Sequence, residues 1–171
     1  GVKEKAQVIA QSLTSLGTLW VAIGDAEAHG EGRGRPQYQK ALEFLTQAKD
    51  KYEEGFSEGH PKVAWAIEGI ANCHQKCGDL RSAHNAWEEV IRIRTKLQQE
   101  GGGKALFSKE LSKANDAKTQ VAEARAGTRA KLQGSLMKVR KMASGENVIR
   151  GLADAMKLIS GGQPSEGVSG E

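Results

Sequence analysis

The sequence is poor in residues that interrupt helices or build sheets. Its 171 positions include only three prolines and 5% aromatic residues, and we find no convincing strand pattern. Alanine, glutamine, lysine and glutamate recur instead, and such small or straight-chain residues favour helices. We therefore expect an all-α protein. Because only 38% of the residues are hydrophobic, its core should be modest.

Cysteine is also scarce. Cys73 and Cys77 are the only two, and their spacing puts them one turn apart on the same face of a helix. This arrangement does not indicate a disulfide framework. It favours reduced thiols in an intracellular compartment, either cytoplasmic or organellar. A start at Gly1 rather than Met is compatible with a processed protein or a fragment that lacks an N-terminal targeting segment.

Membrane-spanning and secretory patterns are not apparent. No apolar run approaches the roughly 20 residues that cross a bilayer, and no charged start precedes a hydrophobic signal region. We expect no membrane span.

Motifs for catalysis are missing as well. The sequence has no phosphate-binding loop, no GxSxG or HExxH motif and no paired acidic motif. Glu53-Glu54 and Glu88-Glu89 fit solvated helix faces, and the glycines at 101–103 fit a linker. We expect no enzymatic activity and no cofactor.

The nearest approach to a metal site is the set Cys73, His74, Cys77 and His84, since thiolates and imidazoles bind zinc. His74 does not share the face of Cys73, and no second pair of cysteines exists. We favour two cysteines of the core or of a groove, and we expect no metal.

Charge is distributed unevenly along the chain. The net charge is +4, but residues 1–103 carry 13 basic and 14 acidic side chains, whereas residues 104–157 carry 12 and 5. The basic character therefore belongs to the C-terminal part. A functional electrostatic surface should lie there.

An internal repeat organises the first hundred residues. At an offset of 54, Ile9-Ala10 aligns with Val63-Ala64, Leu16-Gly17 with Ile70-Ala71, and Gly24-Asp25 with Gly78-Asp79. Further along, the offset falls to 42 and pairs Ala41 with Ala83, Leu45 with Trp87 and Ala48 with Val90. The difference predicts an insertion in the first unit, which we place in the glycine-rich loop at about 26–36.

Each unit is predicted to be a helical hairpin. The expected helices are 3–23 with 37–55, and 61–77 with 80–99. Pro61 suits the first turn of a helix, and Gly78 suits a left-handed helix end that Asp79 follows as a cap. The two units occupy 1–100.

A different region follows the glycine run and spans 104–160. A long helix is predicted at about 105–143, and a shorter one at 146–159. A stripe of small and apolar residues marks the long helix. It comprises Leu111, Ala114, Ala117, Val121, Ala124, Thr128, Leu132, Leu136, Val139 and Met142. We expect its Leu-, Met- and Val-rich second half to bury more than the first, either within the chain or by coiled-coil pairing. The tail at 161–171 should be disordered.

The repeat resembles the tetratricopeptide repeat (TPR), in particular the 42-residue variety of kinesin light chains. The second unit matches best, through Ile67, Ile70, Ala71 and His74 in its first helix and Ala83, Trp87 and Val90 in its second. The resemblance implies a stack of hairpins that holds a partner segment in a concave groove. Two units are fewer than the three that such stacks usually need. We therefore expect the long helix to cap the stack, or a partner to complete it.

The resemblance also implies which residues line the groove. They are the outward positions of the first helices: Gln11, Thr14, Thr18, Val21 and Ala22, then Trp65, Glu68, Asn72, Gln75 and Lys76. We expect Trp65 to anchor an apolar side chain, Asn72 to bracket a peptide backbone, and Lys76 to meet an acid. Family members that grip a C-terminal carboxylate carry Lys and Asn where this chain has Thr14 and Thr18. A carboxylate clamp is therefore not indicated.

The sequence thus favours a non-catalytic scaffold or adaptor that binds other proteins as a subunit of a larger complex. The competing hypothesis is a subunit that binds nucleic acid or another anionic surface through the C-terminal helices. Its candidate residues are Arg125, Arg129, Lys131, Lys138, Arg140, Lys141 and Arg150. No aromatic residue follows Phe107 to stack on a base, which weakens the case for nucleic acid.

Overall fold

Helices are the regular secondary structure of the described part of the chain. The computed structural model describes residues 1–27, 34–100, 108–143, 150, 156 and 157, and these residues contain no strand. Five helices are defined: α1 Val2–Glu27, α2 Arg35–Gly55, α3 Pro61–Cys77, α4 Leu80–Glu100 and α5 Ser108–Ala143. The all-α prediction is confirmed, with boundaries close to those expected. The predicted helix at 146–159, the tail and most of the loop at 26–36 lie outside the described residues.

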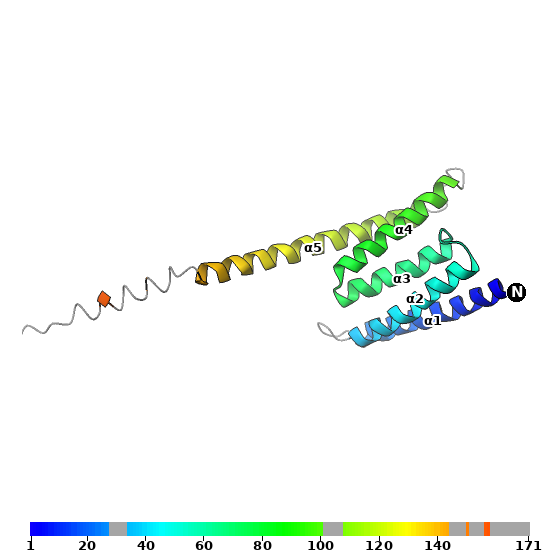
Figure 1. Ribbon diagram of the computed structural model, residues 1–171, viewed down its shortest axis with the longest axis horizontal. Helices are drawn as coiled ribbons and strands as arrows, with labels where there is room; N and C mark the ends of the chain where they lie inside the picture. The colour runs from blue at the N-terminus through cyan, green and yellow to red at the C-terminus, as the bar shows by residue number, and fades with distance from the viewer. Residues whose placement is uncertain (28–33, 101–107, 144–149, 151–155, 158–171) are drawn as a thin grey trace, which may run out of the picture. The chain divides into compact units, whose positions relative to one another are not determined.

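The chain forms two compact units. The first comprises Gly1–Ala126 and the second Gly127–Glu171, so the division falls within α5 rather than at the glycine run. In the first unit α1 packs on α2, α2 on α3, and α3 on α4 (Figure 1).

The turn between α3 and α4 forms as the sequence predicts. Gly78 adopts a left-handed conformation with φ of 81°, and its N–H donates to the carbonyl of Gln75. The Asp79 carboxylate accepts a hydrogen bond of 3.1 Å from the Ser82 N–H, which caps α4. At the other end of α3, His60 Nδ1 accepts from the Lys62 N–H, and Pro61 occupies the first turn.

Close approach of α1 and α2 depends on glycine. A Cβ at Gly17 would lie 2.7 Å from Cγ of Leu45, and one at Gly24 would lie 2.6 Å from the Tyr38 ring. Both distances are shorter than van der Waals contact. The side of α1 that is buried on α2 therefore consists of small residues, namely Ala6, Ala10, Thr14, Gly17 and Gly24. Larger apolar side chains of α1, Leu16 among them, are exposed.

The second hairpin carries most of the core. Ala71 and Ala83 are fully buried in one cluster with Ile67, Trp87 and Val90. Both alanines therefore belong to the core that α3 and α4 share. A second, smaller cluster joins Ala41 and Leu45 of α2 to Cys73 of α3.

Within the chain itself, the first half of α5 is more buried than the second, which is opposite to the intramolecular packing expected. Ala114 and Val121, from the alanine-rich first half, are fully buried and join the core cluster of α3 and α4. In the second half, Leu132, Leu136, Val139 and Met142 are exposed. Helical periodicity identified the apolar stripe of α5. The stripe residues that pack on other helices of the first unit are the smaller ones, Ala114 and Val121.

The expectation about membrane segments also needs correction. Residues 7–24 carry no charged side chain, and α1 is long and apolar enough, by length and composition, to cross a membrane. Gln, Ser, Thr and Gly interrupt the apolar run, so the sequence does not read as one continuous hydrophobic segment. Mostly buried core helices and N-terminal signal sequences meet the same criterion, and 22% of the apolar window of α1 is buried in this structure.

Candidate protein-binding groove

A small hollow lies where the expected groove was placed, between α1 and α3. It has a volume of about 210 Å³. Six of the ten expected groove residues line it, and they are Thr14, Thr18 and Val21 of α1 with Trp65, Glu68 and Asn72 of α3. Leu45 and Gly69 complete the lining. Side chains that lie about fifty residues apart in sequence, and that the repeat pattern aligns, therefore line one hollow.

A larger hollow of about 880 Å³ adjoins the first and lies among α3, α4 and the first part of α5. Trp65 and Glu68 line both hollows, so the two meet at these side chains. Lys109, Lys113 and Asp116 stand on its α5 side. The sequence did not place α5 in the groove. At the offset of 42, Lys109 and Lys113 take the positions of the core residues Ile67 and Ala71, so the sequence indicates no third repeat.

Trp65 is the most prominent side chain of the groove. It is 54% exposed, although tryptophan is a large apolar residue. Around it, Thr14 Oγ1 donates to the Ala10 carbonyl at 2.8 Å and Thr18 Oγ1 donates to the Thr14 carbonyl at 2.9 Å. Thr14 is buried and its hydroxyl also lies 3.4 Å from the Tyr52 hydroxyl, so only the exposed Thr18 oxygen is free to accept a hydrogen bond from a partner. The half-buried Asn72 offers both an amide donor and an acceptor.

Glu68 of α3 connects α4 and α5 beside the groove. Its carboxylate accepts a hydrogen bond from Arg94 at 2.5 Å and from Lys113 at 2.9 Å, and Arg94 also donates to the Glu110 carbonyl at 2.9 Å. Burial alone would raise the pKa of Glu68, but the hydrogen bonds and charges of Lys113 and Arg94 outweigh it and lower the pKa. We expected Glu68 to meet a partner. Instead, its carboxylate is engaged within the chain.

Sequence reasoning missed Arg94, which is buried together with Glu68. A signal was present, because Arg94 continues the apolar series Ala83, Trp87 and Val90 of α4 at helical spacing. An arginine on a core-facing stripe needs a buried acceptor. The sequence could not say which acid supplies it.

The other expected groove residues lie away from the hollow. Lys76 pairs with Asp25 of α1 at 2.5 Å, and its ammonium stands over the Tyr38 ring. The hydrogen bond from Lys76 lowers the pKa of Asp25, and burial together with the hydrogen bond to Asp25 raises the pKa of Tyr38 to about 12. Gln11, Ala22 and Gln75 do not line the hollow either.

The four candidate metal ligands do not converge in the described part of the chain. No group of three His, Cys, Asp or Glu side chains there could hold an ion. Cys73 packs against α2, while His74 lies 3.5 Å from Asp79 and His84 lies 3.9 Å from Glu88. Burial raises the pKa of Cys73 to about 12 and raises that of Cys77 as well.

Because Cys73 is fully buried and burial raises its pKa, we expect this thiol to resist alkylation in the folded protein. Iodoacetamide at pH 8, followed by mass spectrometry, should leave Cys73 unmodified in the native state and should label it fully in guanidinium. Rapid native labelling of Cys73 would contradict the burial described here.

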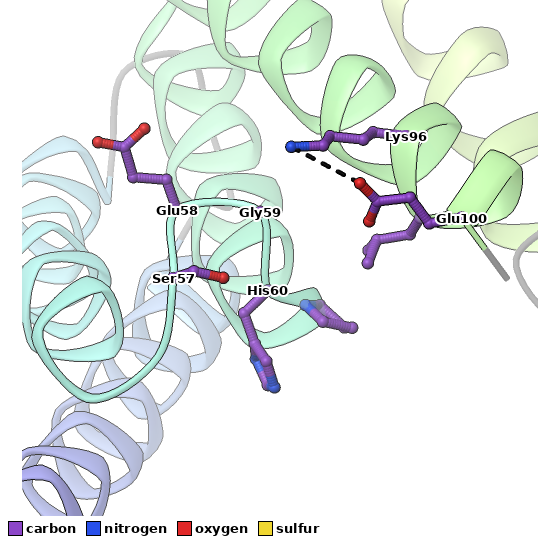
Figure 2. Close-up of a pocket in the computed structure, with 8 residues that line it drawn as sticks. Ser57, Glu58, Gly59, His60, Lys96 and Glu100 are labelled. Carbon is purple, nitrogen blue, oxygen red and sulfur yellow. Dashed lines mark ion pairs between the residues drawn. The ribbon is translucent and has the colours of Figure 1, made fainter.

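A third hollow, of about 440 Å³, lies at the turn between α2 and α3. Figure 2 shows Ser57, Glu58, Gly59 and His60 of this turn on one side and Lys96 and Glu100 of α4 on the other. The two α4 side chains are exposed and pair with each other at 3.8 Å. Because no buried polar group lines this hollow, we assign it no binding role.

The basic residues proposed for an anionic surface are all exposed. Arg125 belongs to the first unit, whereas Arg129, Lys131, Lys138, Arg140, Lys141 and Arg150 belong to the second. Residues 124–143 include six basic side chains and no acidic one.

No family model, curated protein or solved structure matches the chain.

Proposed function

We propose that the chain is a non-catalytic interaction module, built from two TPR-like hairpins, that holds a segment of another protein within a larger assembly. The groove between α1 and α3 is its binding site. The observation that carries the proposal is the exposed Trp65 at the junction of two hollows.

The chemistry of the groove suits a mostly uncharged, extended segment. Trp65 supplies apolar area, and tryptophan is among the residues that most often dominate binding energy at interfaces. Asn72 and the Thr18 hydroxyl supply hydrogen bonds to a peptide backbone. Because Arg94 and Lys113 already engage the Glu68 carboxylate, Glu68 presents no free negative charge at the centre of the groove. An apolar side chain on Trp65, flanked by backbone contacts, fits this surface best.

Replacing Trp65 by alanine should weaken partner binding about 30-fold, which corresponds to the roughly 2 kcal/mol typical of a hot spot. Peptides selected from a display library on the wild-type chain would serve as probes, and their affinities would be measured by fluorescence polarisation. The melting temperature should change little, because the side chain is largely exposed.

Leu136→Ala is the matched control, since Leu136 is also large, apolar and exposed but lies in the second unit. It should leave the affinity unchanged. Selected peptides that bind Trp65→Ala as tightly as the wild type would refute the groove.

A second candidate function is binding to an anionic partner through the basic second half of α5. The absence of any acidic side chain in residues 124–143 favours it. Such binding should weaken steeply with salt, whereas groove binding should tolerate salt. Charge reversal at Arg129, Lys138 and Lys141 should leave peptide binding in the groove unchanged. If the reversal abolishes all binding, the groove proposal fails and the electrostatic one stands.

A further inference from the structure

A row of exposed apolar side chains runs along α1 on the side away from the groove. Val2, Ile9, Leu16 and Ile23 recur every seven residues. Val2 is 84% exposed, Ile9 47% and Leu16 42%, and Ile23 is half-buried. Leu19, on the same side, is 55% exposed. Apolar residues that repeat every seven positions over three heptads are typical of a helix that packs along another helix. We call these five residues the α1 seam.

The internal repeat shows what covers the equivalent side of α3. At the offset of 54, Ile9 corresponds to Val63, Leu16 to Ile70 and Leu19 to Cys73. Val63 and Cys73 are fully buried, and Ile70 is partly buried. They belong to the same clusters as Tyr52, Ala41 and Leu45 of α2. On α3 this face packs against a helix, whereas on α1 none of the described helices of the first unit buries Ile9, Leu16 or Leu19.

We propose that a second copy of this chain covers the α1 seam, with the two α1 helices antiparallel about a twofold axis at Leu16. In this register Leu16 meets its own copy and Ile9 meets Ile23 of the other protomer. A twofold interface must be self-complementary, and the heptad row satisfies this requirement on both sides of the axis.

Charge selects the antiparallel direction. On the side of the α1 seam, Lys5 lies at the N-terminal end of α1 and Glu27 at the other end, and residues 7–24 are uncharged. Antiparallel pairing brings Lys5 of one copy near Glu27 of the other. Parallel pairing would put like charges together at both ends, which opposes association.

The dimer leaves the proposed groove open. Thr14, Thr18 and Val21 line the groove from a side of α1 roughly opposite the α1 seam, because they differ from the seam positions by about half a turn. Dimerisation would therefore give two accessible grooves in one particle. The inference does not depend on what the groove binds.

Light scattering after size-exclusion chromatography of the full chain, over a concentration series, tests the association. The wild type should shift from monomer to dimer mass. Leu16→Asp should weaken the dimer at least about 10-fold, because it brings two carboxylates together at the axis. Leu136→Asp, at a side chain that is 67% exposed in the second unit, is the control and should dimerise as the wild type does. Circular dichroism checks that both variants fold.

Charge exchange tests the direction of pairing. Lys5→Glu and Glu27→Lys should each weaken self-association, and a mixture of the two should recover a heterodimer, detected by native mass spectrometry. Failure of the mixture to recover would overturn the antiparallel register.

A wild type that stays monomeric at every concentration overturns the proposal, as does a dimer that Leu136→Asp breaks and Leu16→Asp does not. Binding to phosphatidylcholine vesicles tests whether lipid covers the α1 seam instead. If the monomeric wild type binds them and Leu16→Asp does not, lipid rather than a second copy covers the α1 seam.

Discussion

Arg94→Ala is expected to lower the free energy of unfolding by about 3–5 kcal/mol, the usual cost of breaking a buried ion pair from one side. The Arg94 and Glu68 side chains are 8% and 11% exposed. Removing the guanidinium leaves Glu68 paired only with the exposed Lys113. It also removes the hydrogen bond from Arg94 to the Glu110 carbonyl. The first part of α5 loses an attachment at the same time.

Urea unfolding followed by circular dichroism measures this cost. Arg92→Ala is the matched control, because Arg92 lies two residues away on α4 and its side chain is 65% exposed. It should change stability by less than about 1 kcal/mol. Lys113→Ala should also cost little, since that side chain is 71% exposed. Equal stabilities of Arg94→Ala and Arg92→Ala would contradict the role assigned to the pair.

The stability that the Glu68–Arg94 pair contributes should decrease as the pH falls. Because the folded protein lowers the pKa of Glu68, the unfolded chain binds the proton more readily as the pH falls. The stability from the ionised pair is complete above the ordinary pKa of a glutamate, and it disappears as the pH falls through the lowered value. The difference between wild type and Arg94→Ala should therefore shrink in acid.

Local signals placed the helices well. Pro61, Gly78 and Asp79 determine backbone geometry within a few residues of themselves, so the ends of α3 and the start of α4 follow directly from the sequence. The burial of Ala71 and Ala83 in one core cluster could also be predicted, because the two units of the internal repeat carry small residues at the same positions. The groove residues Trp65 and Asn72 followed from the same register.

Long-range partners could not be predicted in this way. Periodicity shows which side of a helix is apolar, but it does not show whether another element covers that side. Leu132 and Leu136 are therefore exposed, although Ala114, on the same stripe, is buried. The Glu68–Arg94 pair joins two helices across 26 residues of sequence. Nothing local in either helix identifies the other partner.

Trp87 provides the second large effect, and two substitutions at this position should act very differently. It is the largest of the fully buried side chains and packs between α3 and α4 in the main core cluster. Trp87→Ala should cost about 3–5 kcal/mol, through lost burial and the cavity that remains.

Trp87→Phe should cost far less. The indole N–H of Trp87 is buried and has no hydrogen-bond partner within the described part of the chain. An unsatisfied buried donor costs about 1–3 kcal/mol, and phenylalanine removes it while keeping most of the ring. The gain offsets much of the lost packing, so the stability of Trp87→Phe should lie within about 1.5 kcal/mol of wild type. Urea unfolding of both variants beside Trp65→Phe, at an exposed position, makes the comparison. If Trp87→Phe is as damaging as Trp87→Ala, the indole N–H contributes to stability through a bond that the described residues do not contain.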